Sequence, residues 1–598
     1  MNIRELFKIF ETIFDTSRCF DYLNKIYEND KYFNFAAFEK TARNCAYFMR
    51  EAGLDDIEFL PVKADGRTAY GDWVIPQAWD AEYAVLKSNG EIFADYQETP
   101  CSLVMYSAPT PVGGITAEAV IVDKIESADI NLLKGKIIVT SRPIRDIVPV
   151  AVKSGAVGIA SDFIPLFKGV RDNLDDMQDI SKWENELKIP INDTGLFAFS
   201  LSPANGSKLR ELILKNQAEP FYLSAEVKTR LYDGECYTVS GKIKGETKDA
   251  VCIYAHLYEP GAHDNASGCA VTLELAACIS DAVKRGILPK PKRTLNFIAG
   301  YECVGSVAWI TAKERSAVCG FVADMVGTDK IDNTRMSIWH TPMSNISFAD
   351  AYINNIIEEY IKYKNINFEW ESKKFSIGTD NILGDPYFNM PAPAMIAEPA
   401  LSYHSSLDTP ERIEKGVVFR NSVIIGAYLF GLAAADIKEA EQLWKMTLEY
   451  INEFKTDNIF FKHEMLDTAR KSMIKFCPEY TPDIETSEKV RLCNPPDYTG
   501  ERAYFIPVRT TAGCLTFRAR RELADAPYQP AWNDRLNLPL FWADGKRNLW
   551  EIAVLSAEET QIREFSGSAY DIESHWHWLS DYFIFLEDNG YLKNMLYG

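Results

Sequence analysis

Apolar strand-like runs alternate with helix-like runs between residues 236 and 435. Short apolar runs predict buried strands over 251–255, 295–299, 320–323 and 392–397. Longer runs in which apolar residues recur every three to four positions predict helices over 266–284, 305–315, 348–363 and 411–435. This alternation is typical of an α/β fold, in which a mixed central sheet is sandwiched by helices.

The flanking segments follow other patterns. Residues 1 to about 60 are predicted to be helical, with a stop at Gly53. Short β-rich runs predict an inserted domain, with strands over 119–123, 135–140 and 155–160. A short helix is expected over 148–154, with Pro149 in its first turn.

The last segment predicts a mixed domain. Helix-like runs with an apolar seam, which are typical of a winged-helix-like bundle, cover 546–555, 557–564 and 570–587. Because 598 residues exceed the size of one core, we expect about three or four domains. The predicted parts are an N-terminal part of the main domain (1–99), a β-rich insert (100–235), the rest of the main domain (236–435) and a C-terminal domain (436–598).

Charge and cysteine usage narrow the class of protein. The net charge is −21, which disfavours nucleic acid and anionic membranes as partners. Residues 541–598 carry four basic against ten acidic residues, so packing or a homo-oligomer contact is the better expectation for this end. The N-terminus lacks the apolar core of a signal peptide. Twelve cysteines without a CxxC pair favour a reducing, cytoplasmic location.

Two histidines and three carboxylates come at or near the ends of successive predicted strands: His256, Asp264, Glu302, Asp324 and His404. Open α/β sheets place their sites beyond the carboxyl ends of the strands, so these side chains are expected to meet. A pair of zinc ions takes this mixture of imidazole and carboxylate ligands, and one carboxylate can bridge the two ions. The sequence therefore predicts a metal site with two zinc ions.

The residues around these positions resemble a known family. The matching segments are AHL at 255–257, GAHDNASG at 261–268, YECVGS at 301–306, ADMVG at 323–327, GTDN at 378–381 and YHSSLDT at 403–409. They resemble the co-catalytic zinc aminopeptidases, the family of the bacterial leucyl aminopeptidases, glutamate carboxypeptidase II and glutaminyl cyclase. Residues 100–235 resemble a protease-associated domain, and the two ends are similar to bacterial aminopeptidase-like proteins with a winged-helix domain.

The resemblance implies a role for each position. Asp264 would bridge the two metals, after a tight turn formed by Gly261 and Ala262. His256 and Asp324 would complete one metal's ligands. Glu302 and His404 would complete those of the other. A glutamate would take the proton from the attacking water and pass it to the leaving amine.

Two positions depart from the family pattern. The family has two consecutive glutamates where this chain has Tyr301 and Glu302, so Glu302 is either ligand or base. Family members carry an aspartate two residues after the first histidine, where this chain has Tyr258. If Glu302 is the ligand, Glu259 is the nearest candidate for the base, and if Glu302 is the base, the second metal is short of a ligand. Glu259 is also the nearest substitute for the aspartate that is missing after His256.

The function predicted from these residues is a metallo-aminopeptidase with peptide substrates. Two alternatives stay open: acyl transfer of the glutaminyl cyclase kind with one metal, and a binding or scaffold protein on a peptidase fold. Five further residues are expected to support the ligands or contact substrate: Glu259, His263, Asp380, Tyr403 and Asp408. For Asp380, orientation of the loop near His404 and a turn cap are equal alternatives.

Overall fold

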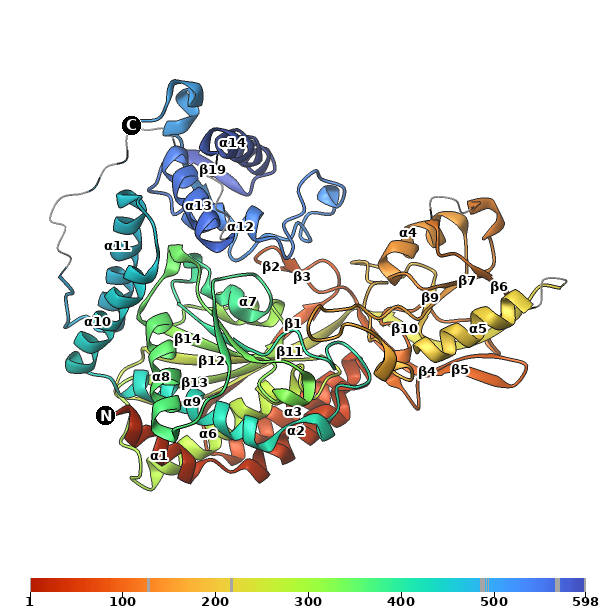
Figure 1. Ribbon diagram of the computed structural model, residues 1–598, viewed down its shortest axis with the longest axis horizontal. Helices are drawn as coiled ribbons and strands as arrows, with labels where there is room; N and C mark the ends of the chain where they lie inside the picture. Colours follow the sequence, from red (N-terminus) through yellow and green to blue (C-terminus); the bar gives the residue numbers. More distant parts are fainter. Residues whose placement is uncertain are drawn as a thin grey trace.

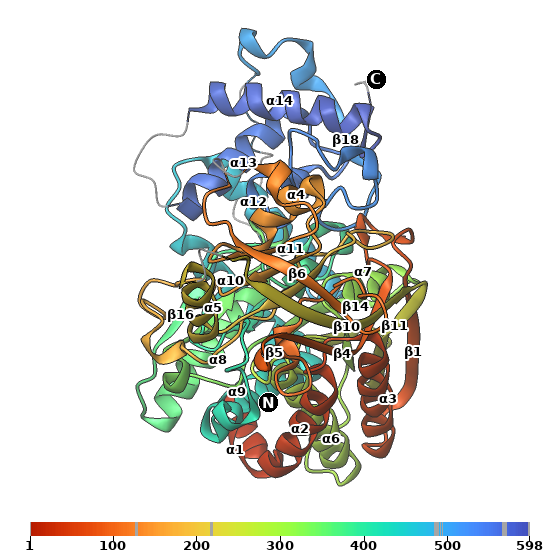
Figure 2. The same ribbon diagram turned by 90° about the vertical axis from the view of Figure 1, so that its right-hand side faces the viewer.

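The computed structural model of the protein describes residues 2–125, 129–215, 219–483, 490, 492, 494–564 and 571–595. Two large sheets organise these residues, and the chain leaves the main sheet after its first strand, forms the whole second sheet and then returns (Figure 1). The second sheet and its helices lie to the right of the main sheet in Figure 1, and the C-terminal helices lie above it. The view turned by 90° shows the same C-terminal helices above the rest of the chain (Figure 2).

The main sheet has eight strands in mixed order. From one edge to the other they are β1 Asp55–Ala64, β11 Gly234–Ile243, β13 Thr294–Tyr301, β12 Ala250–Leu257, β14 Ala317–Ala323, β17 Ala394–Ile396, β15 Met336–Trp339 and β16 Trp370–Lys373. The four central strands β13, β12, β14 and β17 are parallel, so their carboxyl ends meet at one edge. The strands predicted over 251–255, 295–299, 320–323 and 392–397 are these four, which confirms the mixed α/β core.

Helices cover both faces of this sheet. They are α1 Ile3–Ile13, α2 Thr16–Asp30, α3 Phe35–Glu51, α6 Ala266–Lys284, α7 Val304–Thr311, α8 Phe348–Lys364, α9 Lys415–Ala434, α10 Ile437–Glu453 and α11 Ile459–Phe476. Helices α3, α6 and α9 pack on one face, with α1 and α2 outside them, and α7 packs on the other (Figure 1). Helix α6 is buried along nearly its whole length, because its apolar residues surround it on all sides.

The second sheet has seven strands and two helices. Its order is β5 Glu91–Asp95, β4 Ala78–Ser88, β10 Tyr222–Tyr232, β6 Ile115–Ile121, β7 Ile137–Thr140, β8 Gly158–Ser161 and β9 Phe197–Ser200. Its helices are α4 Ile144–Ser154 and α5 Pro203–Lys215. This sheet begins at Ala78, earlier than the insert predicted over 100–235, because β4 pairs along its length with β10. The division of the chain into domains stays a prediction.

The C-terminal part carries three helices and a small sheet. The helices are α12 Asp534–Trp542, α13 Leu549–Glu564 and α14 Ile572–Asp588, and β18 Ile506–Arg509 pairs with β19 Leu592–Met595. Another small sheet, β2 Ala69–Tyr70 with β3 Trp73–Val74, contacts this part. Between its strands, the buried Asp72 carboxylate accepts the backbone N–H groups of Thr516 and Phe517 and the hydroxyl of Tyr591. The N-terminal third and the C-terminal part are thus bound together.

Several predicted boundaries are wrong. Pro149 is the sixth residue of α4, not in its first turn, so its missing N–H removes one interior hydrogen bond. The runs predicted at 546–555 and 557–564 form the single helix α13, because no residue between them stops the helix. The helix predicted over 305–315 ends at Thr311. Residue 570, where the last run was expected to begin, lies outside the described residues.

Two described helices, α6 and α9, are apolar and long enough to cross a membrane by composition alone. In α6 and α9, 89% and 78% of the apolar window is buried inside the protein. That burial is expected of core helices, so the composition of these two helices is weak evidence for a membrane span.

Candidate metal centre

The site lies where the central parallel strands end. His256 is the penultimate residue of β12, Glu302 directly follows β13, and Asp324 directly follows β14. Asp264 lies in the loop between β12 and α6, and His404 lies in the loop after β17. Because the four strands are parallel, their carboxyl ends bring these residues to one edge of the sheet, as the sequence predicted.

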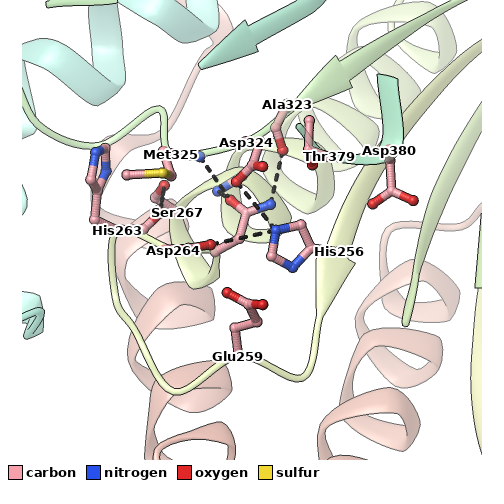
Figure 3. Close-up of polar contacts among 12 residues, drawn as sticks. His256, Glu259, His263, Asp264, Ser267, Ala323, Asp324, Met325, Thr379 and Asp380 are labelled. Carbon is pink, nitrogen blue, oxygen red and sulfur yellow. Dashed lines mark hydrogen bonds and ion pairs between the residues drawn. The ribbon is translucent and has the colours of Figure 1, made fainter. Parts of the chain in front are cut away.

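The first group of ligand atoms comes from His256, Asp264 and Asp324. The Nε2 atom of His256 lies 3.2 Å from Oδ1 of Asp324 and 3.5 Å from Oδ1 of Asp264 (Figure 3). All three side chains are buried, and their ligand atoms lie within 4.8 Å of one another. The capping of α6 leaves Asp264 free for this contact, since the helix cap is the neighbouring Asn265.

The second group consists of Glu259, Asp264 and His404. The Nε2 atom of His404 lies 3.2 Å from Oδ2 of Asp264 and 3.9 Å from Oε2 of Glu259. Asp264 therefore directs one carboxylate oxygen to each histidine and belongs to both groups. This is the arrangement expected of a carboxylate that bridges two metal ions.

Electrostatics at the first group favour a bound cation. Burial by itself lowers the pKa of His256, but the carboxylates of Asp324 and Glu259 raise it well above the ordinary value for histidine. The pKa of Glu259 is raised well above its usual range by burial and by repulsion from Asp264. Buried carboxylates that repel one another bind a divalent cation favourably. Two imidazoles and three carboxylates also have the chemistry that zinc takes, so the residues present fit two zinc ions.

Glu302 lines the same cavity but belongs to neither group of ligand atoms within the part of the chain that the structure describes. The place that the resemblance gave to Glu302, beside His404, is taken by Glu259. Burial raises the pKa of Glu302 to about 8, with repulsion from Asp380 adding to this and the charge of His256 opposing it. A partly buried carboxyl with a raised pKa that lines a cavity is typical of a group that exchanges a proton.

Asp380 supports the Glu302 loop, not the His404 loop. Its Oδ1 accepts the backbone N–H of Cys303 at 2.8 Å, while its other oxygen has no hydrogen-bond partner among the described residues. Burial raises the pKa of Asp380 to about 7. The observed contact is with the loop after β13, so neither of the two alternatives predicted for Asp380 describes it.

Asp408 and His263 hold the ligand loop from behind. The two oxygens of Asp408 accept the N–H groups of His263 and Asp264 at 2.6 and 3.0 Å. His263 is fully buried, and its Nδ1 accepts the N–H of Gly327 at 3.3 Å. The other ring nitrogen therefore carries the proton and faces the carbonyl oxygen of Ala397. His263 thus lies within the fold, and substrate in the cavity does not reach it.

Aromatic rings fix the orientation of His404. Its ring lies 3.7 Å from the ring centroid of Tyr403 and 4.0 Å from that of Trp183. The backbone N–H of Trp183 also donates to the carbonyl of His404 at 3.0 Å. Trp183 belongs to the segment between β8 and β9, so the second sheet helps to position a candidate metal ligand.

Tyr258 does not supply the missing carboxylate. It is buried against aromatic rings, and Nδ1 of His256 has no hydrogen-bond partner among the residues described. A carboxylate from another element contacts this loop: Oδ2 of Asp30, in α2, accepts the N–H of Tyr258 at 3.1 Å. Burial raises the pKa of Asp30 to about 7. The N-terminal helices therefore take part in forming the loop.

Four residues of the site have left-handed backbone conformations. Tyr258, Cys303, Met325 and His404 have φ values of 74°, 57°, 49° and 53°. None is glycine, and such conformations are uncommon for other residues. Tyr258 directly follows β12, whereas Cys303 and Met325 lie two positions beyond the last residues of β13 and β14. The chain therefore turns sharply at each of these strand ends. Backbone strain gathered in this way is typical of functional sites.

A cavity of about 380 Å³ opens over the ligand groups. Besides the predicted residues, its lining includes Glu398, Lys188 and Arg518, which the sequence analysis missed. Glu398 directly follows the strand predicted at 392–397, just as Asp324 follows the strand predicted at 320–323. Its position at a strand end could therefore have identified it. Burial raises the pKa of Glu398 to about 7. Lys188 and Arg518 come from other parts of the chain, and no local pattern marks them.

Replacement of Gly261 by alanine is expected to weaken metal binding. A Cβ atom at this position would overlap Oδ2 of Asp408 and lie 2.5 Å from the carbonyl oxygen of Asp264. The loop would have to move, and the Asp264 carboxylate with it. Metal content of the purified variant, measured by plasma mass spectrometry, is expected to fall to one ion or none per chain.

Gly416→Ala is the matched control for this substitution. Gly416 lies in the first turn of α9, where an added Cβ meets no atom within 4 Å. Alanine also favours a helix over glycine by about 1 kcal/mol, so metal content and thermal stability are expected to be kept or improved. Unchanged metal content in Gly261→Ala would contradict the close packing of this turn.

Comparisons with known proteins find distant structural similarity to zinc aminopeptidases. The zinc aminopeptidase of Bacillus subtilis is 18% identical, with 70% of this chain and 95% of that chain covered and a TM-score of 0.49. The aminopeptidase of Aneurinibacillus sp. strain AM-1 is 18% identical, with 72% and 96% covered and a TM-score of 0.44. The glutaminyl cyclase of Bacteroides thetaiotaomicron is 17% identical, with 32% and 77% covered and a TM-score of 0.26. No curated protein matches the chain.

One family of sequences matches most of the chain. The model of the family described as a domain of unknown function, DUF4910, matches residues 54–428. This range includes the second sheet, all eight strands of the main sheet and every residue of the two ligand groups. The chain therefore belongs to the DUF4910 family.

Proposed function

We propose that the protein is a metal-dependent aminopeptidase that removes N-terminal residues from peptides and holds two zinc ions. The observation that carries this proposal is the position of Asp264, whose two carboxylate oxygens face two different histidines. A carboxylate shared in this way is suited to hold two metal ions in one site.

The ligands divide between the two groups. His256, Asp264 and Asp324 would hold one ion, and Glu259, Asp264 and His404 the other. Zinc bound at these positions would lower the pKa of a water molecule and polarise the scissile carbonyl. Glu259 would thus fill the ligand place left by the missing second glutamate.

Glu302 would then be the general base. It faces the cavity, stands outside both ligand groups and has a raised pKa. Its carboxylate would take a proton from the attacking water and give it to the leaving amine. The hydrogen bond from Cys303 to Asp380 keeps the backbone next to Glu302 in place. In this proposal Glu302 has one role, that of base, and Glu259 has the role of ligand.

The shape of the cavity favours cleavage at a chain end. Its walls come from the main sheet, from residues 182–188 beside the second sheet, from Trp73 to Pro76, and from Arg518 and Trp532 near the C-terminus. A volume of about 380 Å³ suits a ligand of a few residues at most. A partly buried carboxyl, that of Glu398, also lines it and offers an acceptor for a free N-terminal amine.

Other parts of the proposal rest on the sequence. We propose a cytoplasmic location, with peptides as partners and neither nucleic acid nor membrane. A protease-associated identity for the second sheet and a winged-helix identity for α12, α13 and α14 are proposals of the same kind. A homo-oligomer contact through the C-terminal part is also open to test.

Metal content and turnover of the purified full-length chain test this function together. Two zinc ions per chain and release of the N-terminal residue from a panel of aminoacyl p-nitroanilides and dipeptides are expected. One zinc ion, with cyclisation of N-terminal glutamine, would instead support acyl transfer. Absence of zinc and of turnover from zinc-loaded protein would support a binding protein and contradict the proposal.

A further inference from the structure

Two cationic side chains line the cavity beside the ligand groups. Lys188 comes from the segment before β9, and Arg518 from the segment between β18 and α12. Both are only partly exposed. Neither has a carboxylate within ion-pair distance among the described residues, and the hydrogen bond of the Lys188 amine is a long one of 3.4 Å to the side chain of Asn185.

The segment that carries Lys188 is fixed to the rim of the metal centre. Ser181 exchanges backbone and side-chain hydrogen bonds with Ser406, and Trp183 donates to the carbonyl of His404. At its other end, the carbonyl of Pro190 accepts the N–H of Gln77 at 3.1 Å. Lys188 therefore lies on a segment held at both ends.

Arg518 is fixed from a third part of the chain. The two residues before it, Thr516 and Phe517, donate their N–H groups to the Asp72 carboxylate, each at 2.6 Å. Its guanidinium lies over the ring of Trp73, 5.5 Å from the ring centroid, and Trp73 is itself a wall of the cavity. An arginine stacked in this way keeps its donor fork available for a planar anion.

The charges of the two side chains reinforce the case for an anion. Burial lowers the pKa of Lys188 to about 8, and the positive charge of Arg518 adds to this, while carboxylates nearby, Glu186 first among them, oppose it. Two cations that repel each other in a partly buried place bind an anion with less competition from water. Lysine and arginine together suit a carboxylate, which accepts charge-assisted hydrogen bonds from both.

We propose that Lys188 and Arg518 form a carboxylate-binding subsite, so that the substrates are peptides with a carboxylate close to the bond that is cleaved. This inference rests on the proposed aminopeptidase function and adds the substrate class. Two sources supply such a carboxylate: the C-terminus of a very short peptide, or an acidic N-terminal side chain. The two cations come from separate segments that both line the cavity.

Paired substrates separate the two sources. Leu-Gly is compared with Leu-Gly amide for the C-terminal carboxylate, and glutamyl with glutaminyl p-nitroanilide for the side chain. The wild type is expected to prefer the carboxylate-bearing member of at least one pair by about tenfold in kcat/KM, mainly through KM. The pair that shows the preference identifies the source.

Lys188→Met and Arg518→Met keep the apolar stem of each side chain. In both variants the ratio of kcat/KM for the carboxylate-bearing substrate to kcat/KM for its neutral partner is expected to fall close to one. Arg518→Lys is expected to restore part of it, since charge remains but the planar fork is lost. Lys208→Ala and Arg43→Ala serve as controls, because each removes one charge from an exposed ion pair with Glu91 or Glu39. Both controls are expected to keep the wild-type ratio.

The proposal is overturned if the wild type shows no preference in either pair, or if the preference survives both Met substitutions. Failure of the function itself looks different, because the wild type then cleaves none of the four substrates. In that case the affinities of the wild type for Leu-Gly and for Leu-Gly amide, measured by calorimetry, test the carboxylate-binding subsite. Tighter binding of the acid that is lost in both Met variants supports the subsite, and equal binding overturns it.

Discussion

Asp264→Asn is expected to remove hydrolysis and to lower the zinc content from two ions to at most one per chain. Oδ1 of Asp264 faces His256 and Oδ2 faces His404, at 3.5 and 3.2 Å. Asparagine keeps one acceptor oxygen and replaces the other with an NH₂ group, which does not bind zinc. Loss of residues that merely support ligands costs about 10–100-fold, so loss of a shared ligand is expected to cost more than about 100-fold in kcat/KM.

The backbone around Asp264 is expected to stay in place in this variant. Its N–H still donates to Asp408, and Asn265 still caps α6, so neither contact depends on the changed side chain. Asp281→Asn, in an exposed ion pair on the same helix, is the control and is expected to match the wild type. Two zinc ions and wild-type turnover in Asp264→Asn would remove Asp264 from the bridge.

Glu302→Gln and Glu259→Gln are expected to fail in different ways. Glu302→Gln would lower kcat by about 10²–10⁴-fold with two zinc ions retained, because a general base contributes that much and the residue lies outside both ligand groups. Glu259→Gln would lower the zinc content to one ion, because its Oε2 lies 3.9 Å from Nε2 of His404 in the second group. Metal analysis and kcat are measured on the same preparations.

The two substitutions control each other, since both replace a carboxyl group that lines the same cavity with an amide of similar size. A pH profile adds a second readout: the rise of activity that a base produces with pH is expected to disappear in Glu302→Gln and to persist in Glu259→Gln. Zinc loss in Glu302→Gln with intact metal binding in Glu259→Gln would reverse the assignment. Glu302 would then be the ligand that the family resemblance placed beside His404.

The sequence predicted those parts of the site that are determined by neighbouring residues. The run 251–255 is apolar and followed by His256, and GAHDNASG leads directly into the helix-like run at 266–284. The strand, the ligand loop and the helix are therefore determined by residues that are close together in the sequence. The parallel strand–helix alternation then places His256, Asp264 and Asp324 at one edge, because carboxyl ends of parallel strands coincide.

Local patterns predicted the wrong element boundaries where a segment is compatible with more than one conformation. Pro149 suited a first turn, yet α4 begins five residues before it, because the buried Ile144 and Ile147 extend the apolar face toward the N-terminus. The second sheet includes β4, from before residue 100, because β4 pairs with β10, which lies more than 100 residues later in the chain, and β5 joins through its pairing with β4. Pairing of this kind has no local signature.

The sequence by itself thus determined the α/β core, the strand ends and a set of candidate ligands around Asp264. Only the tertiary structure decided that Glu259, and not Glu302, stands beside His404, and that Lys188 and Arg518 share the cavity with them. The reason is that ligation depends on distances of a few ångströms between loops. Those distances depend on the order of the strands in the sheet and on the packing of segments that are far apart in the sequence. The residues of a single segment do not specify either of these.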